Sequence, residues 1–507
     1  MLRSFDKFRN AMPLMALSRG RARTAAILFV AASLLWPAIY SGFPIIFPDT
    51  SAYLRVAFGH AWTLDRSGFY GLALKPVSLI DPIEGLWIAT AAQCLAIAAI
   101  LTTVSFRLFQ SFVVVTVVSA LLCIFTSLPW HAAQLLPDAF TGPLILLAWM
   151  LASSDLEDDG VPLVWLAAGA LSLLHYTHLI IFPTVFIAAM IVRAAEGRTL
   201  ASIVRNSVAL IVCCSTVVAA HVAANGIMFK RWTVAPMGSY FLFARVHQDG
   251  LVSDWMDKHC GKDASPELCS LRSNLPRNSQ VLLWGGDRSP LNSRINLHPG
   301  APATWPWIDR LSQAAEGSIR EEPMRFVNNV LRAGARQFIS FQALDDECPS
   351  ECQFGGLTRS KPALGAAIKS SRQVQGRLPK GLIRWVTGVV SSAALLLMIP
   401  TFVLATRRRD WEIVSLWAAV FAGLCVNALL TGGLSDVHDR YQSRIVWLAP
   451  FVVLMAMARW SQRAGKATES ASSVDRSRGA RGLLEKAASL RRQMTTARTA
   501  AASPSTQ

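Results

Sequence analysis

Charged side chains are scarce in this sequence. Asp, Glu, Lys and Arg make up 16% of its 507 residues and apolar residues make up 52%, whereas soluble domains usually carry about 25% charged residues. The apolar residues fall in blocks of about 15 to 22, close to the ~20 that a helix needs to cross a bilayer. The composition therefore predicts a mainly α-helical, polytopic membrane protein.

Several common motifs are also missing. There is no G-x-x-x-x-G-K-[S/T] loop, no G-x-G-x-x-G between a strand and a helix, and no G-x-S-x-G elbow. These absences argue against an ATP-driven transporter and against a soluble enzyme that uses nucleotide sugars. No H-E-x-x-H or C-x-x-C ligand set appears either, so no cofactor is predicted and a divalent metal stays an open alternative.

Acidic residues are rare at both ends of the chain, while basic residues are common there. Of the formal net charge of +17, residues 1–23 supply +5 (six basic, one acidic) and residues 461–507 supply +6 (nine basic, three acidic). Basic flanks of apolar spans predict cytoplasmic termini, with membrane lipids rather than nucleic acid as the partner. The tail is predicted to be disordered, with a basic amphipathic helix at 481–494 as the alternative. The first apolar run follows a long basic leader and is read as a retained anchor.

About ten membrane spans are expected. Residues 161–192 are too long for one span, so we predict two short helices that meet at HYTH (175–178). With both ends inside, the chemically interesting loops then share the outer face. The predicted organisation is a basic N-terminus (1–23), an N-terminal transmembrane domain (24–225) with an outer loop (44–85), an extracytoplasmic region (226–380), C-terminal helices (381–460) and the tail (461–507). The predicted spans are 24–43, 86–106, 108–128, 139–154, two short helices within 161–192 on either side of HYTH, 203–225, 381–405, 411–431 and 445–460.

Four of the nine cysteines lie in the predicted extracytoplasmic region, and the other five lie in spans. An oxidising compartment favours disulfides for these four. Local pairing is the simplest arrangement, although other connectivities and a zinc site remain alternatives. The candidates are Cys260, Cys269, Cys348 and Cys352.

Polar residues that can carry chemistry gather at the predicted outer ends of the spans. Asp49 and Asp138 each follow a proline before a helix, so a helix N-cap is the plain alternative for both. His175 and His178 are spaced to share one helix face, as metal ligands or as a polar turn. Arg440 and Arg444 lie one turn apart, which predicts either a phosphate clamp or snorkelling at the membrane edge.

The layout resembles the GT-C class of polytopic membrane glycosyltransferases, which use polyprenyl-phosphate-linked sugars. The resemblance rests on the many spans, on an acidic residue just after the first span (Asp49 in PDTSAYL), and on HDRYQSRIVWLAP before a late helix. The chain differs from many members of the class in two ways. Asp49 is not part of a D-x-D or E-x-D pair, and the predicted soluble region comes before the last three spans instead of at the C-terminus. We match no specific subfamily.

The resemblance implies a lipid-linked sugar donor and a hexosyl- or pentosyltransferase activity on the outer face of an inner (plasma) membrane. Asp49 is then the catalytic base. The expected substrate-binding residues are Arg66, His131, Asp138, His175, His178, Asp439, Arg440 and Arg444. A polysaccharide polymerase or ligase is a related alternative, and a transporter, flippase or envelope-assembly component is a non-enzymatic one.

Overall fold

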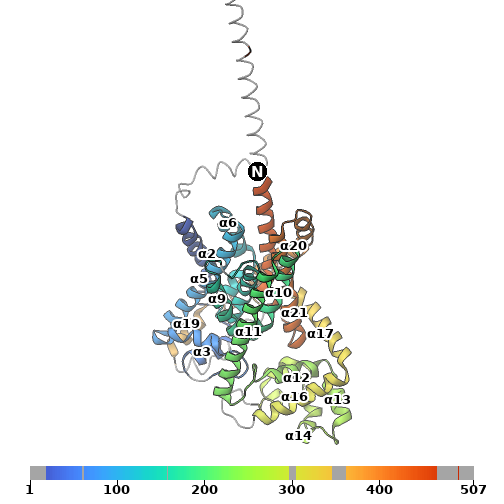
Figure 1. Cartoon of the computed structure of the whole chain (residues 1–507). Helices are drawn as coiled ribbons and strands as arrows, with labels where there is room; N and C mark the ends of the chain where they lie inside the picture. Colours follow the sequence, from blue (N-terminus) through green and yellow to red (C-terminus); the bar gives the residue numbers. More distant parts are fainter. Residues whose placement is uncertain are drawn as a thin grey trace, which may run out of the picture. The chain divides into compact units, whose positions relative to one another are not determined.

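The computed structural model describes residues 19–59, 62–156, 158–295, 304–344, 361–464 and Ser489, and these residues are mainly helical (Figure 1). No β-strand occurs among them, although Ile45 and Gln134 form a parallel β-bridge. Contacts divide the chain into a unit of residues 1–454 and a second unit of residues 455–507. In the second unit, the described residues 455–464 are helical. The basic leader 1–18, the segment 481–494 (except Ser489), Cys348 and Cys352 lie outside the described residues.

Seven of the described helices are long and apolar enough to cross a membrane, which is the character of a multi-pass membrane protein. Three shorter apolar helices accompany them, namely α6 (Phe112–Phe125), the segment Pro137–Ala152 and α9 (Val161–Leu174). A crossing by all ten stays a prediction. The seven are α2 (Arg19–Ser41), α5 (Pro82–Leu108), α10 (His178–Ala195), α11 (Leu200–Phe229), α20 (Lys380–Arg407), α21 (Trp411–Ala428) with the π-turn η6 (Leu429–Gly433), and Asp439–Ala464, which begins with α22 (Asp439–Val446).

The apolar stretch after residue 160 breaks into α9 and α10 at residues 175–177, where the sequence predicts a turn. The break leaves His175 with an extended backbone just after the end of α9. Two polar residues, His175 and Thr177, therefore lie between two apolar helices.

Helix α8 (Thr141–Ala152) is the most enclosed element of the bundle. All of its residues are buried, and it contacts α5, α9, α10 and α21. A helix that is apolar on every side is suited to such a position. The short 3-10 turn η3 (Pro137–Phe140) leads into α8 and brings Asp138 to the start of this central helix.

The turns between the apolar helices gather in two groups, one at each end of α8. At the C-terminal end, Arg107 donates to the carbonyl of Ser153 at 2.5 Å, and Arg198 donates to Asp155 at 2.9 Å. Arg193 pairs with Glu412 at 3.3 Å. These turns are the ones predicted to be cytoplasmic, and Asp155 of the acidic turn is paired with Arg198 of the next one.

The predicted extracytoplasmic region is helical where it is described. Its elements are α12 (Gly238–Gln248), α13 (Leu251–His259), α14 (Pro266–Cys269), η4 (Arg272–Asn274), α15 (Ser279–Trp284), η5 (Gly286–Arg288), α16 (Thr304–Glu321), α17 (Pro323–Ile339) and α19 (Pro362–Ser370). Buried residues of α12, α13, α15 and α16, including Phe243, Trp255, Leu282 and Leu311, form its apolar core.

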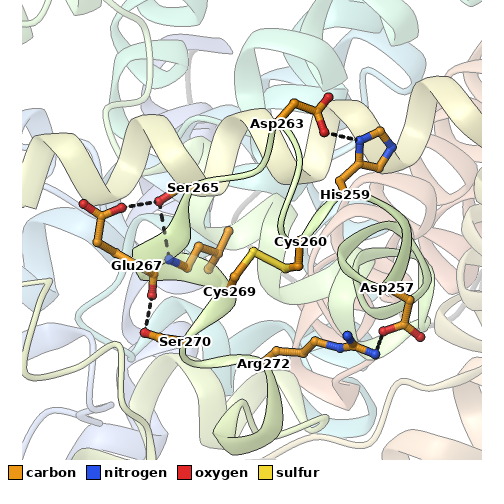
Figure 2. The surroundings of a disulfide bond; sticks show 10 residues. Asp257, His259, Cys260, Asp263, Ser265, Glu267, Cys269, Ser270 and Arg272 are labelled. Atoms are coloured by element: carbon orange, nitrogen blue, oxygen red, sulfur yellow. Dashed lines mark hydrogen bonds and ion pairs between the residues drawn. A yellow bond between two sulfur atoms is a disulfide. The ribbon is translucent and has the colours of Figure 1, made fainter.

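A disulfide between Cys260 and Cys269 joins the end of α13 to α14 (Figure 2). This is one of the two local pairings that the sequence favours. Ser265 caps α14 by accepting a hydrogen bond from the backbone N–H of Leu268. The short helix α14 is therefore fixed by a covalent link at one end and a cap at the other.

Candidate functional site

Asp49 lies at the start of the short helix α3 (Thr50–Ala57), but its side chain makes no capping hydrogen bond. Its carboxylate instead accepts from the guanidinium of Arg66 at 2.5 Å and pairs with Arg440 at 3.5 Å. The exposed fractions of the three side chains are 19%, 18% and 19%, respectively. Asp49 is therefore a partly exposed carboxylate held between two arginines from distant parts of the chain.

Arg66 is held from three sides. It pairs with Asp65 as well as with Asp49, and its guanidinium lies 5.7 Å from the ring of Trp284 in α15. Burial disfavours its charge, but the carboxylates of Asp49 and Asp65 outweigh this effect and raise the pKa of Arg66. Arg66 therefore stays charged, and Trp284 brings the helical region 238–339 to the edge of the site.

Arg440 projects from the first turn of α22. Its guanidinium lies 4.1 Å from the ring of Phe47 and donates a hydrogen bond to the hydroxyl of Tyr441 at 3.1 Å. The segment that carries Phe47 is fixed in turn by Gln373, which donates to the carbonyl of Ile46 and accepts from its N–H. Aromatic and backbone contacts thus hold Arg440 beside Asp49.

Arg444 lies one turn after Arg440, yet its surroundings are different. Its side chain is 0% exposed and pairs with Asp138. It also donates to the side-chain oxygens of Asn427 at 2.7 Å and Thr177 at 3.5 Å. Arg444 therefore ties α22 to the start of α8, to α21 and to the turn before α10. The sequence expects an exposed clamp of two arginines, but only Arg440 of the pair has an accessible side chain.

The three histidines near this network have different partners. His131 in α7 (Leu128–Ala132) bonds to the hydroxyl of Ser443 at 2.8 Å, and His178 bonds to Thr141 at 3.0 Å and to the carbonyl of Leu171 at 2.8 Å. These contacts brace helices against each other.

His175 is the histidine whose surroundings suit contact with a ligand. Its Nδ1 accepts from the N–H of Thr177 at 3.1 Å, which assigns the remaining proton to Nε2. No hydrogen bond to Nε2 is found within the described ranges. Burial lowers the pKa of His175 to about 4, so the ring is neutral at pH 7.

The described residues contain no group of three or more His, Cys, Asp and Glu side chains that could hold a metal ion. The rings of His175 and His178 lie 5.5 Å apart, but His178 uses both of its nitrogens in hydrogen bonds within the protein. In this structure, His175 and His178 therefore belong to a polar turn between α9 and α10.

Tyr53 is a member of the site that the sequence reasoning missed. It lies one turn after Asp49 in α3 and is buried, with its ring edge-on to Tyr70. Burial raises the pKa of Tyr53 well above its usual value. The charge of Arg66 acts against this effect, and the carboxylates of Asp49 and Asp138 add to it. The phenol is therefore neutral and lies near both acidic residues. The one feature of the sequence that could have pointed to Tyr53 is its position four residues after Asp49, one helical turn away.

The stretch before α22 connects the site to the region predicted to be extracytoplasmic. Asp436 accepts from the side chains of Ser279 at 2.8 Å and Gln248 at 3.3 Å. Gln337 of α17 donates to the carbonyl of His438 at 2.7 Å. Asp436 therefore holds α12 and α15 against this stretch.

The turns at the N-terminal end of α8 thus form one connected network. Five segments contribute to it: 43–49, 62–68, 128–138, 175–178 and 432–444. No protein-family model, curated protein or solved structure matches the chain.

Proposed function

We propose that this protein is a membrane glycosyltransferase that moves a sugar from a polyprenyl-phosphate donor to an acceptor on the outer face of an inner (plasma) membrane. The observation that carries the proposal is the partly exposed Asp49 carboxylate between Arg66 and Arg440. A carboxylate can accept the proton of an acceptor hydroxyl, and guanidinium groups can bind the leaving phosphate. Both functions are needed in one place for this reaction.

The contacts suggest how the donor activates the base. Without a donor, both arginines are paired with Asp49, so its carboxylate oxygens are engaged and are not free to contact an acceptor hydroxyl. A donor phosphate competes for the guanidinium groups of Arg66 and Arg440. When they turn to the phosphate, the carboxylate of Asp49 is released next to the sugar.

The reaction then proceeds by substitution at the anomeric carbon. The acceptor hydroxyl transfers its proton to Asp49 while its oxygen forms the new bond to the anomeric carbon. The bond from that carbon to the phosphate oxygen breaks, and its electron pair stays on the phosphate. Arg66 and Arg440 stabilise the charge that develops there. In this proposal, the Nε2–H of His175 donates a hydrogen bond to a sugar hydroxyl.

The test compares the consumption of a lipid-linked sugar by membranes that contain the wild type, Asp49→Asn or Arg440→Lys. We expect Asp49→Asn to abolish turnover, and Arg440→Lys to reduce it because lysine lacks the planar fork of arginine. Asp287→Asn and Arg288→Gln are matched controls, since both residues are exposed in η5. Full turnover by Asp49→Asn would disprove the proposed base.

One observation favours a second candidate, a transporter or flippase. The Arg444–Asp138 pair is enclosed among α8, α21 and α22, and ionisable residues inside a membrane bundle often mark a transport pathway. Translocation of a lipid-linked sugar in proteoliposomes, without its consumption, would support this candidate. A polymerase or ligase would consume the same donor and would be recognised by a polymeric or lipid-linked acceptor.

A further inference from the structure

Helix α17 has two occupied faces and one apolar face that nothing in the described structure covers. On one face, Gly334 approaches Leu429, and Val330 and Gln337 approach Gly433 and Gly432 of the π-turn η6. Met324 and Ile339 on the uncovered face are 77% and 72% exposed, and Val327 and Leu331 are also exposed. The described part of the chain leaves this apolar stripe without a partner.

The second occupied face of α17 is basic and lines a cavity. The cavity holds about 150 Å³ and lies between α12 and α17. Its lining consists of Arg245, Asp249, Asn329, Arg332, Ala333 and Arg336. Three guanidinium groups thus face one carboxylate, which leaves the cavity positively charged.

Arg245 forms the inner wall of this cavity. Its side chain is 7% exposed, and it pairs with Asp249 at 3.0 Å and more distantly with Asp436 at 4.0 Å. Its Nε is buried and has no hydrogen-bond partner among the residues that the structure describes. Arg332 and Arg336 are exposed at the mouth, and no ion pair joins either of them to another described residue. A buried donor without a partner is costly, so this wall is suited to an anion.

The position of α17 indicates where such an anion comes from. The helix packs against η6, which ends the candidate span Trp411–Gly433. The end of a span lies at the level of the lipid headgroups. An amphipathic helix at that level places its apolar stripe among acyl chains and its arginines among phosphates.

We propose that the α12–α17 cavity binds the phosphate of an anionic phospholipid, whose acyl chains run along the exposed stripe of α17. Arg332 and Arg336 hold the phosphate at the mouth, and Arg245 completes the site from within. Arg332 and Arg336 form no ion pair with the described residues of the network around Asp49, and Arg245 reaches that network only through Asp436, at 4.0 Å. The proposed lipid site therefore shares no residue with the proposed transferase centre of Asp49, Arg66 and Arg440.

The test measures lipid binding by the purified full-length protein in detergent. Dihexanoyl phosphatidylglycerol, dihexanoyl phosphatidylcholine and inorganic phosphate are each titrated against the wild type and against the double variant Arg332→Gln/Arg336→Gln. The double variant Arg288→Gln/Arg320→Gln removes the same charge from two other exposed positions and serves as the control. All of these positions are on the surface, so the variants should fold, which melting curves verify.

We expect phosphatidylglycerol to bind at least tenfold more tightly than phosphatidylcholine or inorganic phosphate. Loss of Arg332 and Arg336 should weaken this binding about tenfold or more, because two charge-assisted contacts are lost, while the control binds as the wild type. Unchanged binding by the Arg332→Gln/Arg336→Gln variant would overturn the proposal. Inorganic phosphate binding as tightly as phosphatidylglycerol would overturn the assignment to a lipid.

Discussion

The two aspartate–arginine pairs of α22 differ in burial, and this difference predicts different costs when each carboxylate is neutralised. The exposed fractions are 0% for Arg444 and 13% for Asp138, against 19% for both Arg440 and Asp49. Asp138→Asn leaves the charge of Arg444 enclosed without a counter-charge. Asp49→Asn leaves Arg440 in partial contact with water, which screens its charge.

The magnitudes follow from the two environments. Removing one partner of a buried ion pair costs about 3–5 kcal/mol. Arg444 keeps its hydrogen bonds to Asn427 and Thr177, so we expect the lower end, about 3 kcal/mol, for Asp138→Asn. Partly exposed pairs contribute about 0.2–1 kcal/mol, so Asp49→Asn should cost less than about 1 kcal/mol.

The assay is the free energy of unfolding in mixed micelles, obtained by titration with SDS and followed by tryptophan fluorescence. A third variant, Asp138→Leu/Arg444→Met, removes both charges while filling their volume. It should be more stable than Asp138→Asn, because the enclosed charge has gone. Equal costs for Asp49→Asn and Asp138→Asn would refute the argument from burial, as would a double variant no more stable than Asp138→Asn. In the transferase assay, Asp49→Asn should lose turnover while keeping its stability.

Three further predictions concern stability. Burial lowers the pKa of His131 to about 4, whereas in the unfolded chain it is about 6.5. Between these values the unfolded state binds the proton more tightly, so the free energy of unfolding should be about 2 kcal/mol lower at pH 5 than above pH 6.5, as measured by unfolding across pH. Reduction of the Cys260–Cys269 disulfide, which closes a loop with a sequence separation of 9, should cost about 2–3 kcal/mol, as measured by unfolding with and without dithiothreitol. Gly432→Ala places a Cβ 2.4 Å from the Cβ of Gln337 and should cost about 1–3 kcal/mol in the same unfolding assay.

Each of these predictions has a matched comparison. His131→Gln should show a flatter loss of stability between pH 6.5 and pH 4, and the same slope as the wild type would contradict the assignment. Dithiothreitol should have no effect on the Cys260→Ser/Cys269→Ser variant. Gly388→Ala adds a Cβ with nothing within 4 Å, so a cost equal to that of Gly432→Ala would show that packing against α17 is not the cause.

The membrane class and the positions of the apolar helices could be predicted from the sequence. The blocks of apolar residues coincide with the apolar helices to within several residues at most ends. The break at HYTH was also predictable, because polar residues interrupt a stretch too long for one span. Asp49 and Arg440 could be selected as candidates because each lies near the predicted outer end of an apolar block, and Arg66 because it lies in the same predicted outer loop as Asp49.

The partner of each charged residue could not be predicted. Arg440 pairs with Asp49 and Arg444 with Asp138, across sequence separations of 391 and 306 residues. Spacing along α22 made the two arginines look equivalent. The packing of α8 and α21 around Arg444 made one enclosed and left the other partly exposed.

The sequence by itself determined that the chain forms apolar helices with polar residues at their ends, because hydropathy along the chain decides where a helix can enter a membrane. The tertiary structure decided which of those helices is enclosed by protein. Helix α8 is buried on every side while α11 leaves most of its length uncovered by the rest of the protein. Apolar residues suit either position, because lipid chains and a protein interior are equally apolar surroundings, so only the packing of the helices decides which of them the protein encloses.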